Sequence, residues 1–281
     1  MTSWRSKDSV EVRISSATAG VRSDRLPARP ELSKHNVVSL SPRKTHCASC
    51  ALHGRCLPGG LEGDDIARFD RLVGSQRRLR KGDVVFHAGN PFEALYAIRF
   101  GSLKTSILAE DGREQVAGYH MVGELIGVDG IATGCHTCSA VALEDTEVCA
   151  IAFAGLEELM QTIPGLQHSV RQTLAREVSR NHGLMLLLGS MRAEERVAAY
   201  LLDLAARYRE RGYSASEFVL RMTREEIGSY LGLKLETVSR VFSRLQVDGL
   251  VQAQGRDIKL LDPPMLNRLV GRDVASPSPS P

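Results

Sequence analysis

The residues of this chain whose type and spacing best suit chemistry are cysteines, and three of them lie close together. Cys47, Cys50 and Cys56 fall within ten residues, in a segment rich in glycine (46–60). Its glycines and its proline exclude a long helix or strand, so these thiols lie on a loop. Thiolates bind zinc and iron–sulfur clusters, and either group usually takes a fourth ligand. The spacing therefore predicts a metal or cluster site on this loop.

Two sets of ligands satisfy the cysteine spacing. Two C-x2-C pairs would make a zinc-type site from Cys47, Cys50, Cys135 and Cys138. The three loop thiols with one distant cysteine would instead suit a cubane cluster. Cys149 lies in an apolar, strand-like stretch and by itself would be a core residue. Spacing alone leaves these arrangements open.

Composition bears on where these thiols would operate. The 281 residues carry a net charge of +3, and residues 1–45 contribute nine basic against four acidic side chains. No apolar run reaches the roughly 18 residues of a membrane helix, and the N-terminus lacks the apolar region of a signal peptide. We therefore expect a cytoplasmic protein that does not enter the membrane. Thiols stay reduced in the cytosol, which favours metal ligands over disulfides.

Catalytic motifs do not stand out in the sequence. It has no Ser–His–Asp order, phosphate-binding loop or paired carboxylates, and His46 beside Cys47 is weak support for a cysteine nucleophile. We expect no catalytic residues and no enzyme.

The rest of the sequence predicts an α+β fold, whose strands and helices would position the cysteines. Between 79 and 153, short apolar stretches alternate with glycines, and Asp111-Gly112 separates two of them as in a hairpin. Short strands at such spacing predict an antiparallel β-roll, or jelly roll. We expect, in chain order, a disordered tail (1–45), a cysteine-rich cluster-binding loop (46–60), a β-roll sensor domain (61–163), a dimerisation helix (164–192), a winged helix-turn-helix (193–271) and a second disordered tail (272–281).

The helix that begins near Pro164 carries a heptad pattern with a polar residue at its centre. Spacings of four and three residues separate Leu174, Val178, Asn181, Met185 and Leu188. Such a seam is typical of helix pairing between two chains, where a buried asparagine fixes the register. A helix packed on its own sensor domain is the alternative.

Two short helices joined by a tight turn follow near the C-terminus. Thr223 precedes two glutamates, as at a helix N-cap, and Gly232 marks the turn. A strand–turn–strand pattern around Gly255 then predicts the wing of a winged helix.

In the second of these helices the apolar residues face the core. Glu236, Ser239, Arg240 and Arg244 remain on the outer surface, near the part that a recognition helix presents to the major groove. Arginine can bind guanine with two hydrogen bonds, and glutamate can accept one from cytosine. An exposed Glu–Arg pair without a ligand is the alternative, since the segment 218–250 is nearly neutral.

The order of these parts, together with the stretch 222–240, resembles the CRP/FNR superfamily of bacterial transcription regulators. Glu236, Ser239 and Arg240 match the Glu-x-x-Ser-Arg motif of its oxygen-responsive FNR branch. The resemblance implies binding of a dimer to palindromic DNA with TTGAT-like half-sites. It also implies contact with RNA polymerase through the hairpin loop near 109–113.

The cysteines resemble the same branch. Its C-x2-C-x5-C pattern matches the loop, and the motif around Cys149 carries its fourth ligand. The resemblance therefore implies a [4Fe–4S] cluster on Cys47, Cys50, Cys56 and Cys149, which promotes dimerisation and which oxygen degrades. A zinc- or thiol-based redox regulator of the same fold is the alternative.

Two features depart from the pattern of relatives. The segment around Cys135 and Cys138 lacks the arginine with which cyclic-nucleotide binders hold phosphate, so we expect no cyclic nucleotide. Asn181 stands in the seam where the best-known member has an acidic residue whose repulsion opposes dimerisation. A neutral residue there predicts a dimer that better resists cluster loss.

Overall fold

A computed structural model describes residues 46–109 and 111–271. The expected disordered tails, 1–45 and 272–281, lie outside these ranges. The described chain is α+β, with antiparallel sheets, a long helix and a C-terminal helix-turn-helix, so the predicted fold class is confirmed. No helix within the described ranges has both the length and the apolar character to cross a membrane.

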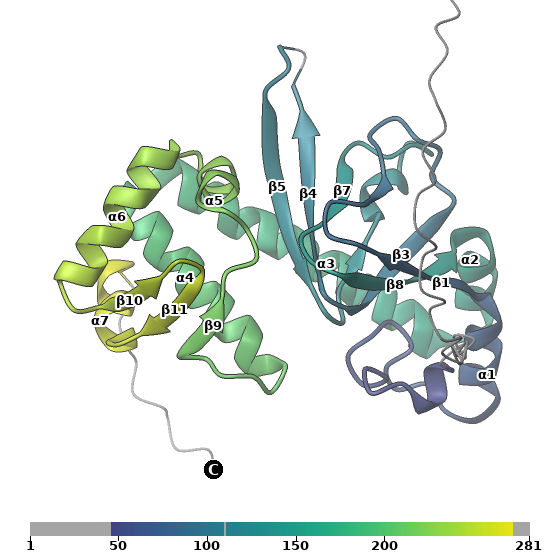
Figure 1. Ribbon diagram of the computed structural model, residues 1–281. Helices are drawn as coiled ribbons and strands as arrows, with labels where there is room; N and C mark the ends of the chain where they lie inside the picture. The colour runs from purple at the N-terminus through teal and green to yellow at the C-terminus, as the bar shows by residue number, and fades with distance from the viewer. Residues whose placement is uncertain (1–45, 110, 272–281) are drawn as a thin grey trace, which may run out of the picture. The chain divides into compact units, whose positions relative to one another are not determined.

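Two four-stranded antiparallel sheets form the β-roll (Figure 1). One has the strand order β1-β8-β3-β6 and the other the order β2-β7-β4-β5. The bounds are β1 Val73–Leu79, β2 Val84–Phe86, β3 Ala94–Phe100, β4 Ser102–Leu108, β5 Glu114–Met121, β6 Leu125–Ile126, β7 Ser139–Ala142 and β8 Thr146–Ala152. The predicted hairpin at Asp111-Gly112 joins β4 to β5, and Gly112 adopts φ 83°, which favours glycine.

Short helices flank the roll. They are the 3-10 helices η1 (Cys47–Ser49) and η2 (Val128–Gly130), with α1 (Gly63–Leu72) and α2 (Phe153–Thr162). The helix α1 ends at Leu72, and Val73 begins β1 and pairs with Ile151 of β8. Sequence reasoning also missed α2, whose ten residues lie between the last strand and Pro164.

Two longer helices follow. The helix α3 (Pro164–Ser190) has 27 residues and begins with proline in its first turn. The helix α4 (Ala193–Glu210) starts after a two-residue break. Arg196 of α4 donates hydrogen bonds to the carbonyls of Leu188 and Met191 at the end of α3, and to Leu231. One guanidinium therefore joins the end of α3 to the helix-turn-helix.

The C-terminal part contains β9 (Glu217–Val219), α5 (Arg224–Leu231), α6 (Leu235–Val247), β10 (Val251–Gln254), β11 (Asp257–Leu260) and α7 (Pro263–Leu269). The wing predicted around Gly255 is present as β10 and β11, and β9 extends it to three strands. The short elements β9 and α7 carried no signal that was recognised in the sequence.

Buried side chains form three cores. One of them joins the cysteine loop to the long helix, because Leu57 and Leu61 pack in the same cluster as Leu166 and Val170 of α3. The Leu61 side chain lies close enough to Gly165 that a Cβ added there would meet it at 3.5 Å. The loop therefore packs against the first turns of α3.

Candidate functional site

Four cysteines line one cavity of about 30 Å³. Cys47, Cys50 and Cys56 come from the loop, and Cys149 comes from β8, where it stands opposite Ala97 of β3. The rest of the lining is mostly apolar, including Phe69 and Ile151. The structure thus brings together the predicted set of three loop thiols and one distant cysteine.

The loop is held by contacts with α1. The Asp70 carboxylate accepts a hydrogen bond from the Cys47 backbone N–H at 2.8 Å and pairs with His46 Nδ1 at 2.6 Å. Backbone hydrogen bonds close its turns, including those from Cys50 N–H to Cys47 and from Cys56 N–H to Leu52. These contacts place the loop thiols beside β8.

The surroundings of Cys47, Cys56 and Cys149 raise the pKa of these three thiols. Burial raises the pKa of Cys47 to about 12, with a further contribution from the hydrogen bond to Asp70. Burial also raises the pKa of Cys56 to about 12, and it raises the pKa of Cys149 against the opposing effect of Arg99. Metal ligation requires thiolates, so binding of a metal here releases protons.

The four thiols line a common cavity but do not form a site for a single metal ion. Among the described residues, no three His, Cys, Asp or Glu side chains converge closely enough to hold one metal ion. A four-iron cluster takes one thiolate at each iron, so its ligands surround a volume instead of meeting at a point. The four thiols that line this largely apolar cavity are donors of the type that such a cluster takes.

Cys135 and Cys138 do not line this cavity. Cys135 is exposed, and Cys138 is buried in another core beside Ala140 and Val148. The backbone N–H of Cys138 donates to Asp129 at 3.2 Å. The zinc-type set of two C-x2-C pairs is therefore not assembled, and Cys138 is a core residue.

The candidate DNA-reading residues lie on α6. Glu236, Ser239, Arg240 and Arg244 are all exposed, while the opposite face of the helix buries Val238, Val241, Phe242 and Leu245. Arg244 pairs with Asp248 at 3.5 Å.

The turn before α6 is built as the sequence suggests. Thr223 caps α5, because its hydroxyl accepts from Glu226 N–H at 3.1 Å while the Glu226 carboxylate accepts from Thr223 N–H at 2.7 Å. Gly232 ends the helix with φ 62°, a left-handed conformation that favours glycine. These local features fix the angle at which α6 leaves the turn.

The five predicted seam residues of α3 differ in their surroundings. Val178 and Met185 are 54% and 69% exposed, and Asn181 is exposed between them. Leu174 and Leu188 are partly buried against the cores at either end of the helix. The centre of the seam thus presents apolar side chains to solvent.

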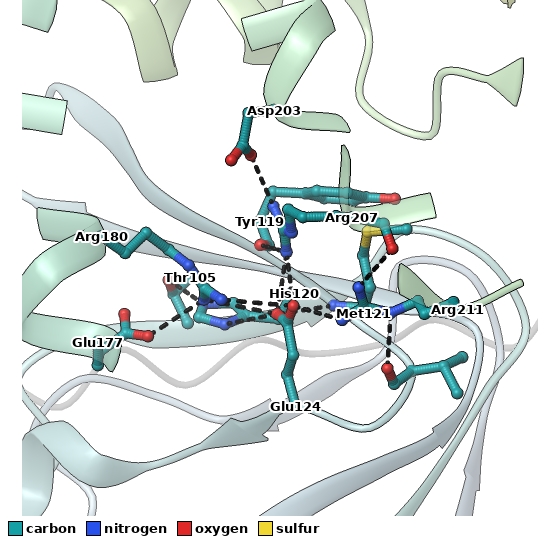
Figure 2. Close-up of polar contacts among 11 residues, drawn as sticks. Thr105, Tyr119, His120, Met121, Glu124, Glu177, Arg180, Asp203, Arg207 and Arg211 are labelled. Atoms are coloured by element: carbon teal, nitrogen blue, oxygen red, sulfur yellow. Dashed lines mark hydrogen bonds and ion pairs between the residues drawn. The ribbon is translucent and has the colours of Figure 1, made fainter. Parts of the chain in front are cut away.

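A buried carboxylate joins the β-roll to both long helices, a network that sequence reasoning missed (Figure 2). Glu124 accepts hydrogen bonds from Arg207 of α4 at 2.9 Å and from Arg211, the residue that follows α4, at 2.5 Å. Arg180 of α3 pairs with it at 3.4 Å. Burial would raise the pKa of Glu124, but the three arginines lower it to about 2. The conspicuous Gly123-Glu124-Leu125 motif was the available signal, although it did not reveal these partners.

Comparison with known proteins identifies the two folded parts. Residues 76–163 match the cyclic nucleotide-binding domain family, and residues 195–269 match the Crp-like helix-turn-helix domain family. The transcriptional regulatory protein btr of Bordetella pertussis is 44% identical over 236 residues, which cover 84% of this chain and 98% of that protein. This chain belongs to the CRP/FNR family of transcription regulators.

Two further CRP/FNR proteins show the same relationship. The anaerobic regulatory protein of Pasteurella multocida is 39% identical over 226 residues, covering 80% of this chain and 83% of that protein. The solved structure of FixK2 from Bradyrhizobium japonicum superposes with a TM-score of 0.65 at 32% identity, covering 73% of this chain and all of that one. CRP/FNR proteins are transcription regulators and not enzymes, which confirms the prediction that the chain is no enzyme.

Proposed function

We propose that this protein is a cytoplasmic regulator of anaerobic or microaerobic gene expression that carries a [4Fe–4S] cluster and binds DNA as a homodimer. The observation that carries the proposal is the meeting of four cysteines, and no other described cysteine, around one cavity. The 39% identical Pasteurella protein, an anaerobic regulatory protein by name, supports the physiological assignment.

The cluster would be held by the thiols of Cys47, Cys50, Cys56 and Cys149. When bound, it would supply the sensitivity to oxygen, because oxygen degrades it. The protein's own part is to connect the loop with α3. Because Leu57 and Leu61 share a core with the first turns of α3, ordering of the loop supports that end of the helix. This coupling favours pairing of the seam at Val178, Asn181 and Met185, flanked by Leu174 and Leu188.

Pairing of α3 would position two copies of α6 for adjacent major grooves. Glu236, Ser239 and Arg240 would then read each TTGAT-like half-site, and Arg244 would add a contact nearby. One half-site alone gives too little affinity against competing genomic DNA. Dimerisation is thus the step through which the cluster controls DNA binding.

The β4–β5 hairpin is the proposed contact for RNA polymerase. Ile107 and Leu108, at the end of β4, are 47% and 67% exposed. An exposed apolar pair on a hairpin tip suits a protein contact.

We propose that the protein does not bind a cyclic nucleotide. The Glu124 carboxylate is already engaged by Arg180, Arg207 and Arg211. His136 lies in the segment that lacks the phosphate-binding arginine, and it is buried and stacked on Phe86 with ring centroids 3.7 Å apart.

Anaerobic purification with iron and sulfide assays tests the proposal. We expect about four iron and four sulfide per chain and a visible absorption band that bleaches in air. Cys149→Ser should abolish both, whereas Cys135→Ser should change neither, because Cys135 is exposed and lies outside the cavity.

Other outcomes would contradict the cluster. Stoichiometric zinc without iron, or a reversible disulfide between Cys47 and Cys50, would support a zinc- or thiol-based redox regulator of the same fold. Equal iron content in the Cys149→Ser variant would remove β8 from the ligand set.

A further inference from the structure

One charged side chain reaches the cysteine cavity. Arg99 lies near the end of β3 and lines the cavity together with all four cysteines. Among the described residues that form the lining, it is the only one that carries a permanent charge. An arginine in an otherwise largely apolar pocket has to be explained by a partner or by a function.

The local backbone of β3 directs this side chain. The register between β3 and β8 is regular from Ala97, opposite Cys149, to Ile98, and then shifts, so that Phe100 pairs with Glu147. Arg99 is therefore the extra residue of a β-bulge, a feature that commonly re-aims a side chain.

Glu147 of β8 holds the guanidinium in place. It accepts a hydrogen bond from Arg99, and its own side chain is only 12% exposed. Arg78 also pairs with Glu147, at 3.3 Å, but its side chain is 73% exposed and does not line the cavity. Glu147 thus has one partner toward solvent and one toward the thiols.

Arg99 lies beside the thiols, because its side chain lines the same cavity as Cys50 and Cys149. Four thiolates around a [4Fe–4S] core give a net charge of about −2, which an apolar cavity disfavours unless a cation compensates it. Arg99 supplies a cation at the required place.

We propose that Arg99, fixed by Glu147, is a positioning residue that stabilises the cluster-bound form by hydrogen bonding to a ligand sulfur and by compensating the cluster's negative charge. This inference rests on the proposed function. Removal of a group that hydrogen-bonds to a metal ligand commonly lowers the affinity for the metal about 10- to 100-fold.

Anaerobically purified protein tests this role. Arg99→Gln should load with iron, lose its visible band in air about tenfold faster than the wild type, and show a more negative reduction potential, because the charge that favours an added electron is gone. Arg99→Lys, which keeps the positive charge, should have a reduction potential close to that of the wild type. Arg78→Gln, which removes the other partner of Glu147, should match the wild type in both measurements.

The outcomes separate the two proposals. Wild-type protein without iron and sulfide overturns the proposed function and this inference together. A loaded wild type with unchanged decay and potential in Arg99→Gln overturns this inference alone. Equal effects in Arg78→Gln and Arg99→Gln would also overturn it. They would show that loss of either ion pair with Glu147 acts by destabilising the β-sheet. Far-ultraviolet circular dichroism of each variant confirms that the compared proteins are folded.

Discussion

At the scale of single residues, the proposed sequence preference depends on the exposed face of α6. Arg240 lies four positions after Glu236, so the two side chains share one face near the start of the helix. The Arg240 guanidinium contacts the Thr237 hydroxyl of the same helix at 3.5 Å. The guanidinium can therefore turn to a base without breaking a contact between domains.

We predict that Arg240→Ala weakens binding to a palindromic TTGAT-type site by about 1–3 kcal/mol per half-site, the range of one good arginine–guanine pair. Discrimination at the contacted base pair should fall as well. Fluorescence anisotropy with matched and substituted duplexes at fixed salt measures both. Arg71→Ala, which removes an exposed arginine of α1, is the control for lost charge. Unchanged discrimination in Arg240→Ala would contradict the assignment.

At the scale of elements, α3 exposes apolar side chains that a second copy would cover. Met185 is 69% exposed, although methionine is ordinarily a buried residue. We predict that Met185→Asp raises the dimer dissociation constant by at least about tenfold, because a carboxylate would be buried in the seam. Analytical ultracentrifugation of the cluster-loaded protein measures the change.

A charge elsewhere on the same helix serves as the control. Ser179→Asp places a carboxylate at an exposed position of α3 outside the seam, and it should leave the dimer unchanged. Asn181→Asp should weaken the dimer, most visibly after cluster loss, because two like charges would meet. Equal dissociation of Met185→Asp and Ser179→Asp would place the interface elsewhere.

Local signals account for the elements that the sequence predicts well. The Thr223 cap, the left-handed Gly232 and the turn at Asp111-Gly112 depend on nearby residues, and all three occur as expected. The short elements α2, β9 and α7 were missed because tertiary contacts stabilise them more than their own periodicity does.

The candidate site was predictable only in part. Cysteine spacing defined the loop, and resemblance to relatives supplied Cys149, which spacing alone left among the core residues. Arg99 had no sequence signal, because its role depends on a bulge and on a partner 48 positions away. Similarly, the three arginines that surround Glu124 come from α3 and from the C-terminal end of α4, and they could not be assigned to it by pattern.

At the scale of the whole molecule, two buried groups make stability depend on pH. The pKa of His120 is lowered to about 4, by burial and against the opposing charge of Glu124, while Arg180 and Arg207 add to the lowering. Both His120 and Glu124 therefore have folded-state pKa values below their ordinary values of 6.5 and 4.5. In each case the unfolded chain binds the proton more readily, so acid favours unfolding.

We predict that the free energy of unfolding falls as the pH decreases from 6.5 toward 4 because of His120, and falls further between 4.5 and 2 because of Glu124. Urea denaturation at several pH values measures the slope. His120→Gln should flatten the upper part of the profile, and the exposed His168→Gln should not. Parallel profiles for wild type and His120→Gln would contradict the prediction.

The contacts of Arg196 couple the end of α3 to the helix-turn-helix. A 27-residue helix is about 40 Å long, so a tilt of about 10° around its middle moves its end by roughly 3.5 Å. Because Arg196 donates hydrogen bonds to the carbonyls of Leu188, Met191 and Leu231, a movement of that end of α3 would also move the helix-turn-helix. A small angular change near the cysteine loop is thus amplified into a displacement comparable to the spacing between neighbouring base pairs, enough to bring a half-site contact into or out of register.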